Sequence, residues 1–494
     1  MRFARGVCVV ILAVLLVFVS VTLGKDPYKE YQKCQKQCQQ ESQGRYSQQK
    51  LCQQGCAEEL QRRQEEKGSW GGSDDVYEGR QEEQEQEQEQ EQEKNPYVFE
   101  DRHFTTRLQS QNGRYRILQN FAERSKLLIG IGNYRVVFLE AEPQTFVVPH
   151  HLDADTILYV AQGKGTVSLV SEDKRESFNI REGDILRISA GTTTYTINRD
   201  NNKKLIIAKL IRPVATPGYF ESFFSAGGEN PESFYRAFSD EILEAALNTR
   251  KDKWQRLFGQ QRQGAILKAS QEQIRALSRQ EEGGQWPFGG QSKGSVNIYE
   301  QRPSQSNQYG QLYEVDSRDY RQLQDLDVSV SLANVTKGAM IAPYYNSEAT
   351  KITIVLDGEG YFEMACPHLS SHQQGQGQQQ HHGGSQQQER GPSYQKVSSR
   401  LKRGTVVVVP AGHPFVAVAS NNQNLQLLCF EINSRNNQRY PLAGKKNVIN
   451  QFEREAKELA FGVSAREVDE VFRSQNEEFF FKGPRQQHQG RADE

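Results

Sequence analysis

The sequence has almost no excess of charge of either sign. Its 494 residues hold 61 lysines and arginines against 62 aspartates and glutamates, a formal net charge of -1. Such a balance creates no long-range field that would hold nucleic acid or an anionic membrane. The hydrophobic fraction is also low, at 36%, but glutamine-rich stretches account for much of the deficit. We therefore expect two globular cores with polar segments around them.

Long apolar runs are missing everywhere except at the N-terminus. Arg2 and Arg5 precede an almost wholly apolar stretch, 9–21, and polar sequence begins at Lys25. This pattern predicts a signal peptide over residues 1–24, because the stretch is too short and wrongly flanked for a stable membrane span. The mature chain is then expected to be soluble, without stable membrane association, and to pass through an oxidising compartment.

Cysteine is scarce, with seven residues, and four of them form a spaced set. Cys34 and Cys38 are four residues apart, as are Cys52 and Cys56, which on a helix places both sulfurs on one face. This spacing therefore predicts a helical hairpin over residues 25–60. Antiparallel helices would pair Cys34 with Cys56 and Cys38 with Cys52, one of the three pairings that four cysteines allow. The hairpin is either a stapled spacer or a peptide with antimicrobial or protease-inhibitory activity of its own.

Residues 61–94 have low complexity and end in QEEQEQEQEQEQEK. Such a composition cannot bury enough apolar surface to offset the entropy lost on ordering. We expect a disordered linker that proteases can reach.

From residue 95 onward, short β-type runs alternate with turn signals, and their order occurs twice. TKITIVLDGEGYFEMA matches DTILYVAQGKGTVSLV, and LKRGTVVVVPAG matches NIREGDILRISAG. The first pair shares Gly163 and Gly358, offset by 195, and the second shares Gly183 and Gly404, offset by 221. The extra residues form a Gln/His-rich insert at about 371–396, expected to be disordered. A repeat this long indicates a duplicated β-sandwich or barrel domain rather than a solenoid.

A helical block follows each copy. In FSDEILEAALNT, Ser239 is the predicted N-cap. The apolar stripe of this helix would consist of Ile242, Leu243, Ala246 and Leu247. The blocks 231–258 and 450–481 carry many aromatic side chains, which would form an exposed patch on a monomer and so indicate an interface. These aromatic residues are Phe234, Trp254, Phe258, Phe461, Phe472, Phe479, Phe480 and Phe481.

The two copies resemble the bicupin organisation of the vicilins, the 7S seed storage globulins. The likeness is carried by YRVVFLEAEPQTFVVPHHLDADTILYVAQGKG in the first copy, and by PYYNSEATKITIVLDGEGYFEMACPH and KRGTVVVVPAGHPFVAVAS in the second. It spans roughly residues 95–485, and the leader is similar to the hairpin segments (alpha-hairpinin-like) found in vicilin leader regions.

The resemblance implies a mainly β fold of two cupin (jelly-roll) barrels, one over 95–265 and one over 291–485, each with a helical arm. A linker over 266–290 would join them, and 486–494 would form a tail. The arms would clasp neighbouring subunits head to tail into a homotrimer. The resemblance further implies a seed storage protein that reaches the protein storage vacuole through the secretory pathway, in a family that includes many food allergens.

Neither copy keeps the metal-ligand set of cupin enzymes, which is two histidines two residues apart on a strand, a nearby glutamate and a later histidine. Adjacent strand residues point to opposite faces, so His150 and His151 cannot both enter the barrel, and the later histidine position falls at Thr194. In the second copy the strand reads Pro-Tyr-Tyr-Asn over 343–346, and Lys351 stands where the glutamate would fall. We find no nucleophile motif, phosphate loop or dinucleotide fingerprint, and so expect a non-enzymatic protein.

A different set of possible metal ligands occurs in the second copy. In YFEMACPH, Cys366 and His368 alternate with two apolar side chains, so all four share a face that should look inward. His413, in VVPAGHPF, is expected on the neighbouring strand. One cysteine and two histidines suit copper, or zinc as the alternative. The resemblance to vicilins adds Tyr97, in an Asn-Pro-Tyr segment, as a further ligand.

The same side chains also fit a barrel core without metal. Cys366 would then be an inert buried thiol and the histidines would be hydrogen-bonded core residues. The first copy has Ser171, Asp173 and Thr192 at the matching positions, so the fold does not force the Cys/His set. Cys429 lies in an apolar strand and is interpreted as a free thiol, with a disulfide to Cys366 as the alternative.

Three functions are compatible with these features. Storage is favoured, because the chain is rich in Gln, Asn, Arg and Glu and has cleavable loops, although with only three Met it is a poor sulfur store. The alternatives are a copper-dependent cupin enzyme or redox protein, and the precursor of an antimicrobial or protease-inhibitory hairpin peptide. Asn334 begins the one N-glycosylation sequon.

Overall fold

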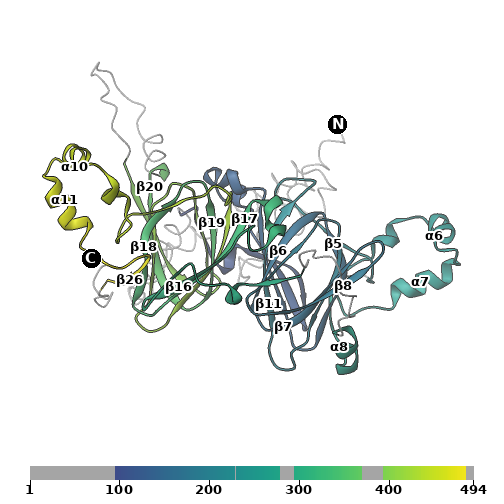
Figure 1. Ribbon diagram of the computed structural model, residues 1–494. Helices are drawn as coiled ribbons and strands as arrows, with labels where there is room; N and C mark the ends of the chain where they lie inside the picture. Colours follow the sequence, from purple (N-terminus) through teal and green to yellow (C-terminus); the bar gives the residue numbers. More distant parts are fainter. Residues whose placement is uncertain (1–94, 229, 279–293, 370–392, 485–494) are drawn as a thin grey trace, which may run out of the picture. The chain divides into compact units, whose positions relative to one another are not determined.

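The structure is a computed structural model that describes residues 95–228, 230–278, 294–369 and 393–484. The predicted signal peptide, the hairpin with Cys34, Cys38, Cys52 and Cys56, the linker over 61–94 and the C-terminal tail lie outside the described residues, as does most of the Gln/His insert. The described chain is mainly β and contains the two predicted barrels, each built from two sheets (Figure 1).

The first barrel follows the β-rich runs of the first repeat. Its larger sheet has the order β14 (Val296–Asn297), β9 (Asp184–Ile188), β6 (Ala154–Gln162), β11 (Leu205–Pro213), β4 (Arg135–Ala141), β3 (Gly113–Leu118) and β2 (Phe104–Ser110). Its smaller sheet has the order β12 (Ser222–Phe224), β5 (Thr145–Leu152), β10 (Thr193–Asn198), β7 (Lys164–Val170) and β8 (Arg175–Arg181), and β13 (Ile266–Lys268) also pairs with β5.

The second barrel repeats this arrangement. Its larger sheet has the order β1 (Val98–Phe99), β22 (Val406–Val409), β19 (Thr350–Asp357), β24 (Leu425–Ile432), β17 (Val328–Val335), β16 (Gly310–Val315) and β15 (Gln305–Asn307). Its smaller sheet has the order β21 (Gln395–Lys402), β20 (Glu359–Cys366), β23 (Phe415–Ala419), β18 (Ala339–Asn346) and β25 (Arg439–Pro441), with β26 (Phe480–Lys482) also pairing with β18.

The barrels exchange their leading strands. The strand β1 precedes the first barrel in sequence, yet it pairs with β22 of the second barrel through Val98 and Val407. The strand β14 precedes the second barrel, yet it pairs with β9 of the first through Val296 and Ile185. Each barrel therefore takes an edge strand from the sequence that leads into the other.

The two faces of strand β11 pack into two different apolar cores. In β11, Ile207 and Ile211 belong to the core inside the first barrel. Ala208 and Leu210, on the opposite face, belong to a second cluster that continues into the core of the second barrel. This alternation follows from the two-residue period of a strand and joins the barrels through a shared apolar layer.

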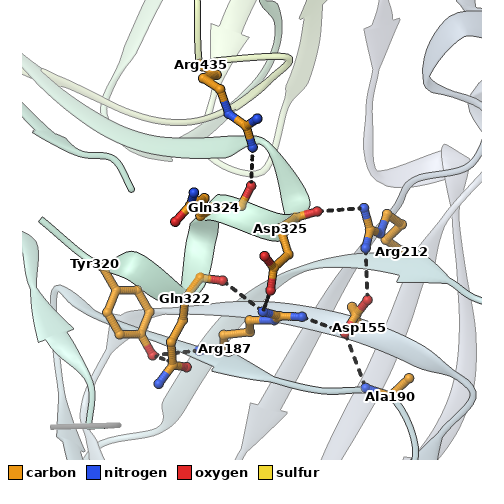
Figure 2. A network of polar contacts seen from close by, with 9 residues as sticks. All are labelled: Asp155, Arg187, Ala190, Arg212, Tyr320, Gln322, Gln324, Asp325 and Arg435. Carbon is orange, nitrogen blue, oxygen red and sulfur yellow. Dashed lines mark hydrogen bonds and ion pairs between the residues drawn. The ribbon is translucent and has the colours of Figure 1, made fainter. Parts of the chain in front are cut away.

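A polar network crosses between the barrels beside this layer (Figure 2). The Asp155 carboxylate accepts from Arg187 at 3.3 Å and from Arg212 at 3.1 Å, all three on the larger sheet of the first barrel. The Arg187 guanidinium also donates to the Gln322 carbonyl and to Asp325, both at 3.1 Å. These two partners lie on η5 (Arg321–Leu326), a 3-10 helix of the second repeat. Guanidinium groups suit this role because they present several donors in a fixed plane.

The helices lie mainly outside the barrels. The arms are α6 (Asp240–Leu247) with α7 (Lys251–Gly259), and α10 (Arg454–Phe461) with α11 (Ala465–Phe472) (Figure 1). The remaining helical elements are α5 (Phe121–Arg124), α8 (Gln271–Leu277), η1 (Asp101–His103), η2 (Lys126–Ile131), η3 (Phe234–Ala237), η4 (Ile298–Glu300) and η6 (Val448–Gln451). Within the described ranges no helix is long and apolar enough to cross a lipid bilayer.

The predicted N-cap of the first arm is confirmed, because the Ser239 hydroxyl accepts from the Ile242 amide at 3.4 Å. The predicted aromatic patch is wrong in part. Trp254, Phe480 and Phe481 are buried, the last two because β26 joins the smaller sheet of the second barrel. Phe461 is exposed as predicted, and the other exposed large apolar side chains of the arm segments are Phe238, Ile242, Leu247, Leu257, Phe452, Leu459, Val463 and Val471.

The segment expected to be a linker, 266–290, is structured at its start. Its first residues form β13, which pairs with β5, and Gln271–Leu277 form α8, capped by Ser270. Ile266 is 2% exposed and packs in the core of the first barrel. This apolar contact ties the segment to the first barrel.

Candidate metal centre in the second barrel

Strand β20 presents Cys366 to the interior of the second barrel. Phe362, Met364 and Cys366 are all at most 1% exposed, so the predicted alternation is confirmed up to this point. The strand ends at Cys366, however, and His368 lies beyond it and is exposed. The prediction that His368 continues the inward face is therefore wrong, because the two-residue alternation ends with the strand.

His413 lies in the turn before β23, not on the strand as expected. Pro410 and Gly412 shape this turn, and Gly412 has a φ of +76°, a conformation that glycine adopts without strain. The ring is 5% exposed, and its Nδ1 lies 3.0 Å from the Ala411 carbonyl oxygen. Its Nε2 is buried without a hydrogen-bond partner of good geometry among the described residues. The imidazole is thus fixed by Nδ1, and its other nitrogen interacts with the Cys366 thiol without a hydrogen bond of good geometry.

Tyr97 reaches this place because of the strand exchange. It immediately precedes β1, and the Val408 amide donates to its carbonyl at 2.9 Å. The side chain is fully buried, with its hydroxyl 3.4 Å from the sulfur of Cys366. The structure therefore brings Tyr97 beside the predicted second-barrel ligands.

The four side chains form a compact group. The ring centroids of His413 and His368 are 5.2 Å apart, and those of His413 and Tyr97 are 6.2 Å apart. In the part of the chain that the structure describes, no three His, Cys, Asp or Glu side chains are already arranged to hold a metal ion. His368 lies beside His413 at the exposed edge of the group.

The environment of Cys366 favours a thiolate. Burial by itself raises the pKa of the thiol, but the interactions with His413 and Tyr97 and with backbone amides outweigh it and lower this pKa to about 7. Burial lowers the pKa of His413, and the nearby thiol and the Ala411 carbonyl raise it above its ordinary value. A thiol with a pKa near neutrality is a suitable metal ligand.

The matching place in the first barrel has a different character. Ser171 and Thr192, the counterparts of Cys366 and His413, line an open polar cavity of about 1470 Å³ together with Gly294, which leads into β14. The group around Cys366 is thus a property of the second barrel alone.

The two adjacent histidines of the first barrel point to opposite faces of β5, as predicted. His150 is 7% exposed and faces the interior, where its register partner is Thr194. His151 points the other way and stacks on Phe223 with ring centroids 5.0 Å apart. In the second barrel, Lys351 occupies the position expected for the glutamate.

Charged side chains inside the second barrel were not predicted. Lys351 donates to the Tyr344 hydroxyl at 2.8 Å and lies 3.1 Å from the Glu431 carboxylate. Arg439 lies 3.7 Å from the same carboxylate and 2.8 Å from Glu314. A charge inside an apolar strand, as in TKITIVL and LQLLCFEI, is the sequence signal that indicates such a buried pair.

Two further residues from the sequence analysis, Cys429 and Asn334, lie on strands of the second barrel. Cys429 is a free thiol, 5% exposed and 3.4 Å from the Thr353 hydroxyl, and Cys366 is also free, so the two form no disulfide. Asn334 lies on β17, and its side-chain oxygen accepts from Gln426 at 3.2 Å. Glycosylation there remains a prediction, and a glycan would attach to the side-chain nitrogen and leave this oxygen as an acceptor.

The comparisons with known proteins agree with this fold. The cupin family profile matches residues 104–252 and 296–469. A vicilin of Corylus avellana is 51% identical over 94% of this chain and 97% of its own length. The crystal structure of hazelnut vicilin is 54% identical, with a TM-score of 0.72 over 79% of this chain and 100% of that one.

A further relative, from Macadamia integrifolia, is named vicilin-like antimicrobial peptides. It is 50% identical over 80% of this chain and 63% of its own length. Vicilins are storage proteins without enzymatic activity. On these matches and on its two barrels, the chain belongs to the vicilins, within the cupin family.

Proposed function

We propose that this chain is a nutrient reservoir of the seed, which stores nitrogen and travels through the secretory pathway to the protein storage vacuole. The observation that carries this proposal is a pair of intact cupin barrels from which the enzymatic ligand set is missing. At the His150 and Lys351 positions the interiors hold a lone histidine and an ion pair in its place. Compact barrels would protect the store, and the glutamine-rich segments predicted to be accessible, 61–94 and about 371–396, would give proteases a place to start.

Storage predicts a particular time course. The chain should accumulate during seed maturation and fall by at least about tenfold during germination, because proteolysis of the accessible segments pulls the folded store toward degradation. Quantitative mass spectrometry of barrel peptides, with an enzyme of constant abundance as the control, measures this course. A level that stays constant through germination would contradict storage.

We also propose that the arms hold the homotrimer together. They carry most of the exposed large apolar side chains of the described residues, and Leu459 is 86% exposed and Leu257 is 68% exposed. Leaving such side chains in water is unfavourable, so an arm that docks on a neighbouring subunit gains apolar burial. A head-to-tail contact of this kind closes into a ring.

We propose that Cys366, His368, His413 and Tyr97 hold one transition metal ion, copper or alternatively zinc. The fit is supported by the buried Nε2 of His413, which makes no hydrogen bond of good geometry, and by the neighbouring Cys366 thiol, whose pKa is about 7. The Ala411 carbonyl fixes the tautomer of His413 and so orients Nε2. A bound ion would supply positive charge that keeps Cys366 as a thiolate and ties the Tyr97 segment to the second barrel.

Elemental analysis tests the metal site. We expect roughly one copper or zinc ion per chain in protein purified from its native tissue without chelators or a tag. The untagged Cys366→Ala variant should lose this metal, while Cys429→Ala, which removes the other buried thiol, should keep it. Absence of stoichiometric metal from the native protein would reject the site and leave these residues as core side chains.

A second function is favoured by the Macadamia relative, whose name refers to antimicrobial peptides. We propose that the cysteine-paired hairpin predicted for residues 25–60 is released with such an activity. This function is compatible with storage by the two barrels, because it uses a separate part of the chain.

A further inference from the structure

Lys209 places an amine inside the first barrel. It lies on β11 between Ile207 and Ile211, which point into the core of that barrel. Strand alternation gives Lys209 the same direction, and its side chain is 6% exposed. A lysine in such a position is unusual, because a charged amine is costly to bury without a partner.

Among the described residues, no acidic side chain pairs with this amine. Within the described residues no ion pair or hydrogen bond joins Lys209 to another group, and its nearest defined contact is the face of the Tyr115 ring, 5.4 Å from Nζ to the centroid. The second barrel offers the contrast, because its buried Lys351 has both the Glu431 carboxylate and the Tyr344 hydroxyl within 3.1 Å. The two buried lysines therefore differ in charge compensation.

Other polar side chains without full hydrogen bonding belong to the same barrel. The hydroxyls of Tyr115 and Thr194 are buried and have no hydrogen-bond partner among the described residues. His150 faces the same interior and bonds only the Val148 carbonyl, at 2.9 Å. Buried polar groups are normally satisfied, so two unpartnered hydroxyls beside an unpaired amine indicate a place for a small molecule.

These groups lie inside the barrel wall. Tyr115, His150, Thr194 and Lys209 are 5–7% exposed, and the hydroxyl oxygens of Tyr115 and Thr194 are out of reach of bulk water. A small molecule therefore reaches the amine only when the barrel wall opens transiently.

The protonation states suit nucleophilic chemistry. Burial lowers the pKa of Lys209 to about 8, so about a quarter of the amine is uncharged at pH 7.5, against about one in a thousand for an ordinary lysine. Burial, and secondarily the charge of Lys209, lower the pKa of His150 to about 4, which keeps it neutral. Burial raises the pKa of Tyr115, with a small opposing effect of Arg107, so its phenol keeps its proton.

We propose that Lys209 is a carbonyl-capture site, whose amine forms a Schiff base with small aliphatic aldehydes inside the first barrel. The amine lone pair attacks the carbonyl carbon and forms the C–N bond, while the C=O π electrons move to oxygen, which takes up a proton. The carbinolamine then loses water and becomes the imine. The Tyr115 hydroxyl is a positioning group that donates a hydrogen bond to the aldehyde oxygen. The reaction needs no oxidant or reductant and does not depend on the storage function.

Trapping in the assembled full-length protein tests the proposal. The protein is incubated with limiting propanal and cyanoborohydride, which reduces the imine to a stable secondary amine, and labelled lysines are mapped by peptide mass spectrometry. We expect Lys209 to label at least about tenfold faster than Lys351, because only Lys209 has an appreciable uncharged fraction. The same reaction after denaturation is the control, since it should label both lysines alike.

Two variants separate chemistry from folding. Lys209→Met should lose the fast label. Tyr115→Phe keeps the amine and should slow labelling of Lys209 several-fold, while surface lysines label as before. A folded wild-type protein in which Lys209 labels no faster than Lys351 would overturn the capture site, whatever the Met variant does. An unchanged rate in Tyr115→Phe would remove Tyr115 from its assigned role.

Discussion

Lys351 and Glu431 form an ion pair inside the second barrel, 3.1 Å apart with both side chains 5% exposed. Burial by itself would raise the pKa of Glu431, but the charges of Lys351 and Arg439 and the hydrogen bond from Ser331 outweigh it and place this pKa below its ordinary value. Burial would lower the pKa of Lys351, and Glu431 reverses that direction. Both partners therefore stay charged in the folded barrel.

Removing one partner should be strongly destabilising. In Glu431→Gln the ammonium of Lys351 stays buried without its counter-ion, so we expect the free energy of unfolding to fall by about 3 kcal/mol or more. Denaturant unfolding followed by fluorescence measures it. The double variant Lys351→Met with Glu431→Gln should recover most of this loss, and a double variant as unstable as the single one would contradict the ion-pair argument.

The same pair gives a pH dependence. Because the pKa of Glu431 is lower in the folded state than its unfolded value of about 4.5, its contribution to stability is complete above that value. The contribution is lost as the pH falls through the lower folded pKa. The wild type should therefore lose stability toward acid more steeply than the double variant.

At the scale of elements, sequence patterns predicted the features that depend on residues close together in the chain. The β-type runs, the repeat offset and the Ser239 cap were correct, because strand alternation and capping depend on residues near in sequence. The orientation of His368 was wrong, since the pattern does not show that β20 ends at Cys366. An alternating motif indicates a shared face only as far as the strand continues.

Contacts between elements far apart in the sequence were the hardest to predict. Tyr97 and Cys366 meet because β1 pairs with β22, and only the resemblance to vicilins suggested Tyr97 as a ligand. The burial of Phe480 and Phe481 depends in the same way on β26 pairing with β18. The aromatic content of the arms was visible in the sequence, but which side chains stay exposed depends on this pairing.

At the scale of the whole molecule, the proposed role of the arms in the trimer can be tested by substitution. We expect Leu459→Asp to weaken the trimer by at least about tenfold in dissociation constant, because a buried interface leucine would become a desolvated charge. Ile129→Asp is the matched control, since Ile129 is 73% exposed but lies outside the arms. Light scattering after size exclusion measures the oligomeric state of both variants. If Leu459→Asp stays as trimeric as the control, this part of the arm is excluded from the interface.

The exchange of leading strands also orders events during synthesis. Val98 pairs with Val407, so about 300 residues must be made after β1 before its partner strand exists. At about 5–20 residues per second, this wait lasts on the order of 15–60 s. Throughout that time β1 lacks its partner strand, and Tyr97 lacks the Cys366 thiol that it contacts. The nascent chain must therefore keep its first strand unpaired until the ribosome has almost finished, and the group around Cys366 closes among the last steps of folding.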